Sequence, residues 1–262
     1  MSRLSPFVSV LIIATLPGFA ATKPSAASSS QALMYAAQAI AALTGGNAIN
    51  DLTLTGTATW TAGSDTENGT VTLTALGPGE SRMDLALTSG TRTEIRDAQT
   101  GIPLGKWAAG KGSGLFAVPN CQTDAVWFFP ALGSLTAGSN VILSYIGQET
   151  RNDESVQHLQ AYIVQPSLAT VFGITTQSLS TVDFYLDAAT LLPSAIAFNA
   201  HPDTDARRNL PVEIDFSRYQ SFGGINVPMH IQKYLQGTLL IDLNITSATF
   251  NTGIPLSTFN IN

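Results

Sequence analysis

The feature that most constrains the fold is a period-two alternation of apolar and polar residues, which begins at Asp51 and runs through most of the chain. Successive side chains of a β-strand point to opposite faces, so this period predicts half-buried strands. No helical pattern separates the first strands, which favours an antiparallel meander over βαβ units. The residues expected on one face are Leu54, Gly56, Ala58 and Trp60, then Val71, Leu73 and Ala75, and then Met83, Leu85 and Leu87.

The second half of the chain repeats the pattern. Residues 183–199, DFYLDAATLLPSAIAFN, predict two short strands around a tight turn. In VEIDF, alternation places Val212, Ile214 and Phe216 inward, with Glu213 and Asp215 outward. Further strands are expected in NVILSYIGQE, SVQHLQAYIV, VPMHIQKYL and TLLIDLNITSATF, the last two joined by a turn at Gln236-Gly237.

Three other segments give weaker patterns. TRTEIR is short and charged on one side, as an edge or solvent-facing strand would be. TDAVWFFPALGSL has the pattern of a short amphipathic helix, and QPSLATVFGITTQSLS that of a loop or short helix. The expected fold class is therefore mainly β (α+β): a wide, curved antiparallel sheet or incomplete β-barrel, with helices covering its concave face.

One helix is predicted near the start of the folded region. Its apolar face would contain Leu33, Ala36, Ala37, Ile40 and Leu43. Ser28 and Gln31 have the spacing of a capping box, and the pair at 45–46, Gly-Gly, suits the C-terminal stop.

Residues 1–20 have the pattern of a secretory signal peptide. Arg3 precedes an apolar run, and Gly18-Phe19-Ala20 ends in small residues that suit cleavage. A transmembrane anchor is the alternative, but the run is short for a span. We expect a flexible spacer at 21–30, a single domain at 31–262 and export to the periplasm.

Composition excludes several classes of partner. Charged residues make up 11% of the chain, the net charge is −6, and no Lys/Arg cluster is present, which argues against binding to nucleic acid or anionic headgroups. Cys121 is the only cysteine, so no internal disulfide can form, and with no histidine near it in the sequence we expect a structural role. We expect a monomer.

Candidate chemical motifs are weak. GKWAAGKG approaches the spacing of a phosphate-binding loop, but Gly112 stands where Ser or Thr should hold magnesium, which favours a β-turn. His158, His201 and His230 lack the close spacing of zinc ligands, and no G-x-S-x-G is present. We therefore expect no metal, no cofactor and no catalytic residue.

Acidic residues share strand faces in two places. Asp183 and Asp187 form one such pair, and Glu213 and Asp215 form the other. Such pairs could flank a sugar, although alternating acids on an exposed face are usually only solvated.

Several local patterns resemble the LolA/LolB-like fold of periplasmic lipoprotein carriers and related regulatory proteins. The first is a strand that reaches Asp187, followed by a turn with Thr190 and Leu192-Pro193. The second is an F-x-x-Y strand end, a G-x-x-x-P turn and a terminal strand pair, here Phe216 to Tyr219, Gly224 to Pro228, and Asn251. The resemblance covers roughly residues 31–100 and 139–262. It implies an incomplete barrel with helices over an apolar cavity, and transport of acyl chains.

The leading hypothesis is a non-enzymatic periplasmic protein that binds a lipid or lipoprotein acyl chain. Two alternatives are an envelope sensor that binds a protein partner and, with less support, a hydrolase. The apolar cavity residues expected to contact the ligand are Trp60, Leu73, Leu85, Trp127, Phe128, Phe129, Tyr145, Phe184, Leu186, Ile196, Phe198 and Phe216. The competing interpretation is that these side chains only fill the core.

Overall fold

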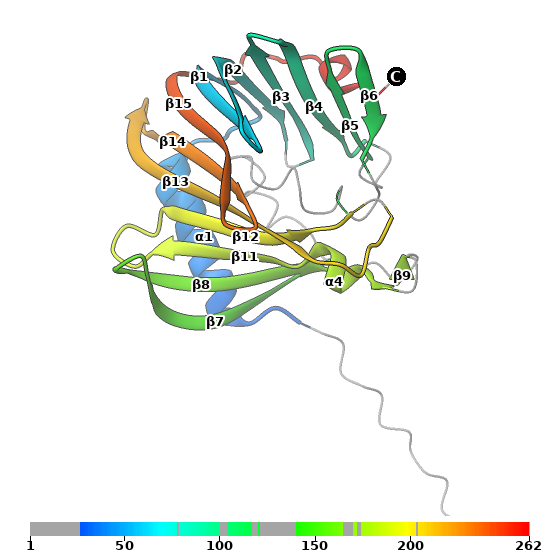
Figure 1. Cartoon of the computed structure of the whole chain (residues 1–262). Helices are drawn as coiled ribbons and strands as arrows, with labels where there is room; N and C mark the ends of the chain where they lie inside the picture. Colours follow the sequence, from blue (N-terminus) through cyan, green and yellow to red (C-terminus); the bar gives the residue numbers. More distant parts are fainter. Residues whose placement is uncertain are drawn as a thin grey trace, which may run out of the picture.

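A computed structural model describes residues 27–77, 79–99, 104–116, 120, 140–164, 170–171, 174–202 and 204–261. Its main feature is one curved sheet of thirteen antiparallel strands, in the order β6-β5-β4-β3-β2-β1-β15-β14-β13-β12-β11-β8-β7 (Figure 1). The edge strands β6 and β7 do not pair with each other. The sheet is therefore an open, incomplete barrel, as the sequence predicted.

The strands of the first half are β1 (Asp51–Ala62), β2 (Asp65–Leu76), β3 (Glu80–Leu87), β4 (Gly90–Asp97), β5 (Leu104–Ala109) and β6 (Gly112–Leu115). The strands of the second half are β7 (Val141–Arg151), β8 (Glu154–Ile163), β11 (Val182–Asp187), β12 (Pro193–Ala200), β13 (Leu210–Phe222), β14 (Ile225–Leu235) and β15 (Thr238–Phe250). A separate two-stranded sheet pairs β9 (Thr170–Val171) with β10 (Ile174–Thr175). The helices are α1 (Ser30–Thr44), α4 (Thr176–Ser180) and the 3₁₀ helix η3 (Leu256–Phe259).

Strand β1 joins the two halves of the sheet. It pairs with β2 on one side and with the last strand, β15, on the other. The ladder with β15 shifts register between Thr55 and Gly56, and a Cβ at Gly56 would lie 2.1 Å from the main-chain oxygen of Asn244. Only glycine fits at this position, because the two main chains approach too closely for any side chain.

Asp51 fastens the end of β15 to the start of β1. Its buried carboxylate accepts hydrogen bonds from the main-chain N–H groups of Thr252 (2.7 Å) and Gly253 (2.8 Å) and from the Thr252 hydroxyl (3.0 Å). Burial raises the pKa of Asp51, but these hydrogen bonds outweigh it and hold the pKa below its usual value. Asn251 adds a hydrogen bond from its side-chain amide to the main-chain oxygen of Ala48.

The two sequence patterns of the resemblance meet in space. The Asp187 carboxylate accepts from the N–H and hydroxyl of Thr190, which fixes the β11–β12 turn. The Tyr219 hydroxyl donates to the main-chain oxygen of Pro193 at 2.7 Å. The Asp-Thr-Leu-Pro turn and the F-x-x-Y strand end therefore stabilise each other.

Helix α1 differs from the prediction in its start and its buried face. Ser29, not Ser28, is the N-cap, and its hydroxyl accepts from the N–H of Ala32. The buried residues are Ala32, Ala36, Ala39 and Leu43, whereas Leu33 and Ala37 are exposed. The small alanines let the helix backbone lie close to the sheet, which turns the larger Leu33 outward.

Two further expectations are corrected. For TRTEIR, expected as an edge or a solvent-facing strand, the edge alternative is wrong, because the segment forms β4, an inner strand between β3 and β5. Ser28 and Ser29, expected in a spacer, hydrogen-bond along the edge of β7, where the Ser29 N–H donates to the main-chain oxygen of Leu143. This contact occupies part of an otherwise free strand edge.

Several expectations fall outside the described residues. They are the signal peptide at 1–20, most of the spacer, Cys121 and the predicted helix TDAVWFFPALGSL. In the part of the chain that the structure describes, no helix has both the length and the apolar character needed to cross a membrane.

Truncating Phe184 tests the core. This side chain is fully buried in β11, so Phe184→Ala should lower the free energy of unfolding by about 3–5 kcal/mol through lost burial and a residual cavity. The control is Leu115→Ala, whose side chain is 66% exposed and whose effect should stay within about 0.5 kcal/mol. Urea unfolding of both variants checks this; equal losses would contradict the assigned core.

Neutralising Asp51 tests the fastening of β15. Asp51→Asn should lower the free energy of unfolding by about 1–3 kcal/mol at pH 7, because it weakens hydrogen bonds to a charged acceptor. The folded pKa is depressed, so this stabilisation is present above the unfolded pKa and is lost as pH falls through the folded pKa. The difference between wild type and variant should therefore shrink below about pH 4, and a difference independent of pH would contradict the assignment.

Candidate functional site

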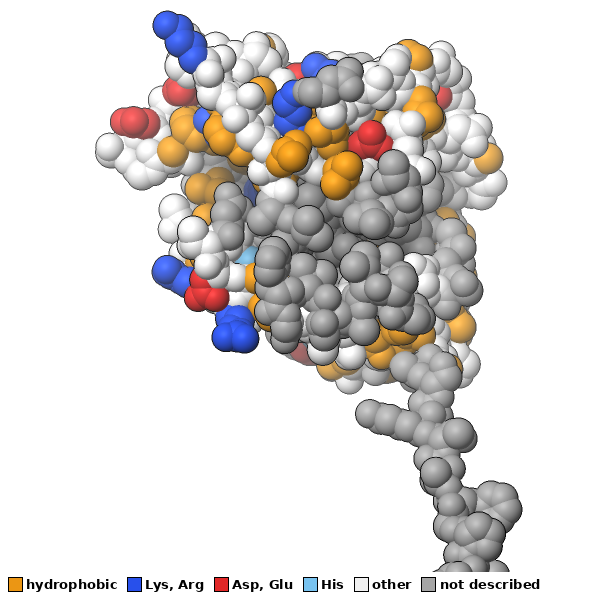
Figure 2. Space-filling view, turned by 90° about the vertical axis from the view of Figure 1, so that its right-hand side faces the viewer, with side chains coloured by type: hydrophobic (Ala, Val, Ile, Leu, Met, Phe, Trp, Pro, Cys, Tyr) orange, Lys and Arg blue, Asp and Glu red, His pale blue; other side chains and the backbone are white. Residues whose placement is uncertain are grey.

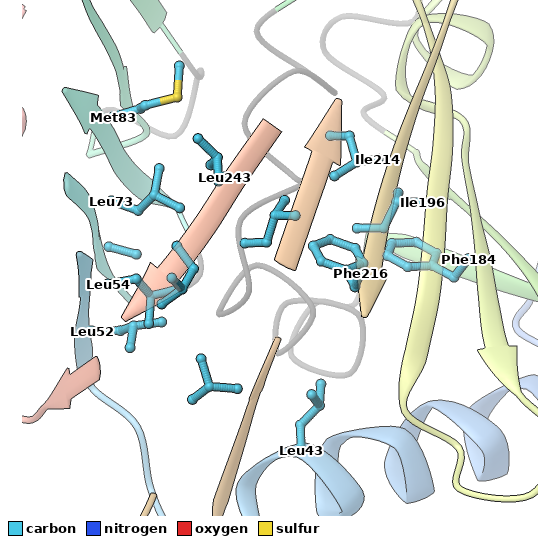
Figure 3. Close-up of a cluster of buried hydrophobic side chains, with 14 of the residues drawn as sticks. Leu43, Leu52, Leu54, Leu73, Met83, Phe184, Ile196, Ile214, Phe216 and Leu243 are labelled. Atoms are coloured by element: carbon cyan, nitrogen blue, oxygen red, sulfur yellow. The ribbon is translucent and has the colours of Figure 1, made fainter. Parts of the chain in front are cut away.

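The candidate site is the concave face of the sheet. Figure 3 shows side chains from both flanks pointing toward one another, with Leu54, Leu73 and Met83 on one flank and Ile196 and Phe184 on the other. Antiparallel register explains this, because residues directly opposite each other share a face and Val71, Leu85 and Gly56 lie in one row. The alternation in the sequence thus becomes one continuous apolar surface.

The structure brings the predicted cavity residues together. Leu73, Leu85, Phe184, Leu186, Ile196, Phe198 and Phe216 belong to one buried cluster, and Trp60 and Tyr145 pack against it while partly exposed. Trp127, Phe128 and Phe129 lie outside the described residues. That these side chains contact a ligand stays a prediction.

Helix α1 is fastened across this face at both ends. At its start, Ser28 and Ser29 bind β7. At its end, the Asn226 amide donates to the main-chain oxygen of Ala42, and Gly45 packs against Gly224 in the β13–β14 turn. A helix of 15 residues is about 22 Å long, which matches the roughly 24 Å between β7 and β14. By the strand order, the helix therefore crosses six strands, from β7 to β14. Figure 1 shows α1 running across this part of the sheet.

Beneath α1 the concave face is filled by the chain itself. The gap between α1 and strands β8, β11 and β12 is lined by Ala36, Ala39, Ile40, Leu43, Leu159, Phe184, Leu186 and Pro193, and its volume is about 10 Å³. This is about the least space that one water molecule needs. In this part of the face, the apolar side chains therefore pack against α1 and leave almost no free space.

The other half of the concave face, from β15 to β5, ends in charged and aromatic side chains. Apolar side chains of β1, β2 and β3 continue the surface, and then Arg92, Glu94 and Trp107 share its face on β4 and β5. The Arg92 guanidinium lies 4.3 Å from the ring centroid of Trp60, within the range of a cation–π contact. Sequence analysis noted that this segment is charged on one side, but as an edge or solvent-facing strand it was not placed beside the apolar face. The alternation of Arg92, Glu94 and Arg96 was the available signal.

Apolar side chains are also exposed near this border. Leu104 on β5 is 42% exposed and Leu115 on β6 is 66% exposed. Figure 2, which views the molecule from the side of β5 and β6, shows hydrophobic side chains gathered in the upper part of that face.

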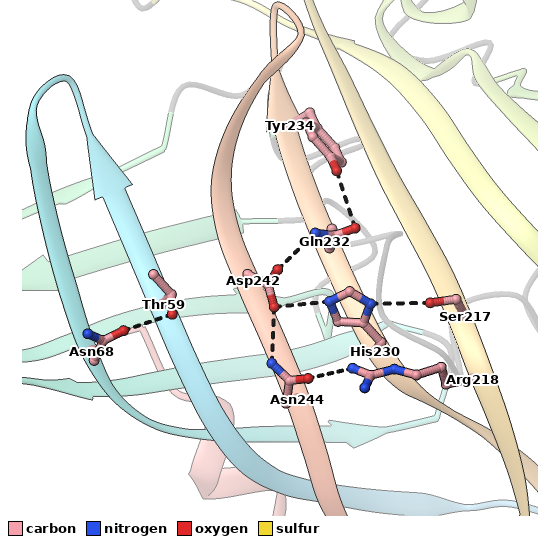
Figure 4. Close-up of polar contacts among 9 residues, drawn as sticks. All are labelled: Thr59, Asn68, Ser217, Arg218, His230, Gln232, Tyr234, Asp242 and Asn244. Carbon is pink, nitrogen blue, oxygen red and sulfur yellow. Dashed lines mark hydrogen bonds and ion pairs between the residues drawn. The ribbon is translucent and has the colours of Figure 1, made fainter. Parts of the chain in front are cut away.

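The outer face of the sheet is polar. The His230 ring forms a hydrogen bond with the Ser217 hydroxyl through Nδ1 (3.3 Å) and with the Asp242 carboxylate through Nε2 (3.0 Å). The side-chain amides of Gln232 and Asn244 also donate to the Asp242 carboxylate (Figure 4). The order Ser-His-Asp resembles a hydrolytic triad, but Ser217 is exposed on a strand face instead of in a pocket. We interpret the group as a cross-strand hydrogen-bond ladder that covers the sheet.

The remaining motifs do not form sites. His158 binds Asp183 at 2.9 Å, and His201 is buried with its Nδ1 atom 3.2 Å from the main-chain oxygen of Arg208. Within the described residues, no group of three or more His, Cys, Asp or Glu side chains is arranged to hold a metal ion. The GKWAAGKG segment is the β5–β6 hairpin, with Gly110 in a left-handed turn, as predicted.

Comparison with solved structures identifies the architecture. The structure matches an outer membrane lipoprotein-sorting protein domain from Vibrio parahaemolyticus with a TM-score of 0.57 and 15% identity, covering 88% of this chain and 96% of that one. It matches a LolA superfamily protein from Nitrosomonas europaea with a TM-score of 0.55 and 10% identity, covering 88% and 97%. The chain has a LolA-like fold. A DUF1329 family protein from Desulfovibrio piger shares this fold, with a TM-score of 0.56, 10% identity and coverage of 88% and 96%.

Sequence comparison adds nothing to this. No protein-family model matches the chain, and no curated protein matches it significantly. The likeness is therefore one of fold, and it extends over nearly the whole length of each related structure.

A glycine pair tests how α1 is held. Gly45 and Gly46 both have positive φ, so alanine is strained at either position, but only a Cβ at Gly45 meets the main chain, 2.3 Å from the Gly224 oxygen. Gly45→Ala should therefore lower the unfolding temperature more than Gly46→Ala and increase amide exchange along α1. Thermal unfolding and hydrogen exchange of both variants check this; identical behaviour would show that α1 is not fastened at this turn.

Proposed function

We propose that the protein is an exported, non-enzymatic binding or carrier protein for a hydrophobic ligand, a lipid or a lipoprotein acyl chain, held on the concave face of the sheet. The observation that carries the proposal is the continuous apolar surface from β3 to β11, which extends beyond the six strands that α1 crosses. The lipoprotein-sorting domain that shares the fold supports the same ligand class.

The physical basis is burial of apolar area. An acyl chain gains about 0.8 kcal/mol for each buried CH₂ group, so an apolar surface can hold it without a charged partner. The gap beneath α1 is already filled, and the inward side chains of β15 and β1–β3 are buried as well, so the ligand must displace α1 or separate side chains that are now packed together. The alanine-rich contact of α1 favours displacement, since three of its four buried residues are alanines.

Export follows from the first twenty residues. Their short apolar run after Arg3 and their small-residue end support cleavage and delivery to the periplasm. A carrier in that compartment would shield acyl chains from water between membranes.

Ligand binding can be measured on the purified mature protein. Native mass spectrometry should detect a co-purified lipid, and a brominated fatty acid should quench tryptophan fluorescence by contact with Trp60 on the concave face. Trp60→Phe should remove part of this quenching, because Trp107 and Trp127 would remain. A protein that carries no lipid and shows no quenching would overturn the proposal. A stoichiometric protein partner recovered from envelope extract without lipid would instead favour the sensor alternative.

A further inference from the structure

A second hollow lies on the outer face of the sheet, on the opposite side from the proposed lipid site. Its volume is about 450 Å³, which lies within the range of small-molecule sites. It is lined by Asn152, Asp183, Ala197, Phe198, Asn199, Pro211, Val212, Glu213, Asp215, Tyr234 and Gly237. Sequence reasoning treated its acids as solvated strand residues, because nothing local shows that they converge.

Small residues on β12 form its floor. The side chains of β12 that point outward include Ala195 and Ala197, and register places Asp183 of β11 and Glu213 of β13 on either side of Ala197. The side chains of Asp183 on β11 and Glu213 on β13 are therefore longer than the alanine side chain of β12 that lies between them. The sequence PSAIAFN produces this shape because its large residues, Ile196 and Phe198, all face the core.

Two hairpins wall the hollow. The β7–β8 hairpin has a register shift at Gly147 and carries Arg151 over the ring of Tyr185, with the guanidinium 4.0 Å from the ring centroid. Its turn residues, Asn152 and Asp153, both have positive φ. On the other side stands the β14–β15 turn with Gly237.

Negative charge in the hollow exceeds positive charge. Asp183 accepts from Gln160 and His158, and Glu213 forms an ion pair with Arg151. Asp215 interacts with Glu213 of its own strand, and Arg151 is the one cation among the described residues that acts on it. Burial, followed by the charge of Glu213, raises the pKa of Asp215 to about 7. Three carboxyl groups thus line the hollow, and the guanidinium of Arg151, which is not a lining residue, is already paired with Glu213.

We propose that this outer hollow binds a small organic cation, whose ammonium group lies between Glu213 and Asp215 and whose apolar stem lies over Ala197 beside Tyr234. A charge-assisted hydrogen bond to a carboxylate is about twice as strong as a neutral one, and a partly buried site screens the charge less than water does. The ammonium group adds a second positive charge beside Asp215, because Arg151 is already paired with Glu213.

A metal ion fits this hollow less well. Asp183 and Glu213 are separated by one strand, so their backbones lie about 10 Å apart, whereas calcium needs its oxygen ligands at about 2.3–2.6 Å. The described residues contain no cluster suited to a metal. A flexible diamine can instead extend from one carboxyl group toward the next.

The test is calorimetric titration of the mature protein at low salt and pH 8, with putrescine as the probe. The matched control ligand is 1,4-butanediol, which has the same carbon skeleton without charge and should not bind. Asp215→Asn removes one charge, and Ala197→Leu fills the floor without changing any charge. Each should weaken putrescine binding by about tenfold or more, which corresponds to about 1.4 kcal/mol. Asp65→Asn, at an exposed carboxylate far along the sheet on β2, should leave binding unchanged.

Circular dichroism and thermal unfolding are the controls that check whether each variant folds. Failure of putrescine to bind at millimolar concentration, equal binding of butanediol, or unchanged affinity in the folded Ala197→Leu variant would each overturn the proposal. Displacement of putrescine by equimolar calcium chloride would also overturn it, in favour of a metal site. These outcomes are independent of lipid binding on the concave face, since the two sites lie on opposite faces of the sheet.

Discussion

The pairing of β1 with β15 is the contact on which the rest of the structure depends. Strands β1–β6 pair with their sequence neighbours. Strands β7, β8 and β11–β15 form a second group, in which β8 pairs with β11 and β9 and β10 take no part. In the described sheet, the two groups meet only through this ladder, between residues about 190 apart in sequence. A contact so distant carries a large loop-closure cost and forms late unless it is strongly specified. Gly56 and the Asp51 carboxylate supply that specification through close main-chain approach and charge-assisted hydrogen bonds.

Once the sheet is joined, its curvature gives the two faces different roles. The concave face collects the large apolar side chains of every inner strand into one cluster, and α1 covers part of it. The helix is held mainly by its ends, at Ser29 and Gly45, and presents alanines between them. Because alanine side chains are small, the middle of α1 buries little apolar area per residue although it lies close against the sheet.

The same alternation that builds the concave face also shapes the outer one. The large residues of β12 face the core, and its outward positions include alanines. The neighbouring strand β13 places Glu213 and Asp215 beside these alanines. The outer face is therefore not a uniform solvated surface. It combines a hydrogen-bond ladder around His230 and Asp242 with a hollow around Asp215, and the β7–β8 hairpin folds over a small apolar patch beside it.

The sequence by itself determined the strand periodicity, the positions of the main turns and the inward set of apolar residues, because these depend on local geometry and side-chain polarity. It also indicated the LolA-like fold through Asp187, Pro193 and Tyr219, because the turn at Asp187 is local and leaves a recognisable pattern in the sequence. Only the tertiary structure decided that β4 is an inner strand, that α1 turns Ala39 and not Leu33 to the sheet, and that Asp183 and Asp215 line the same hollow. Each of these depends on which distant segments become neighbours in the sheet. The alternation of apolar and polar residues along one strand carries no information about the strand that lies beside it.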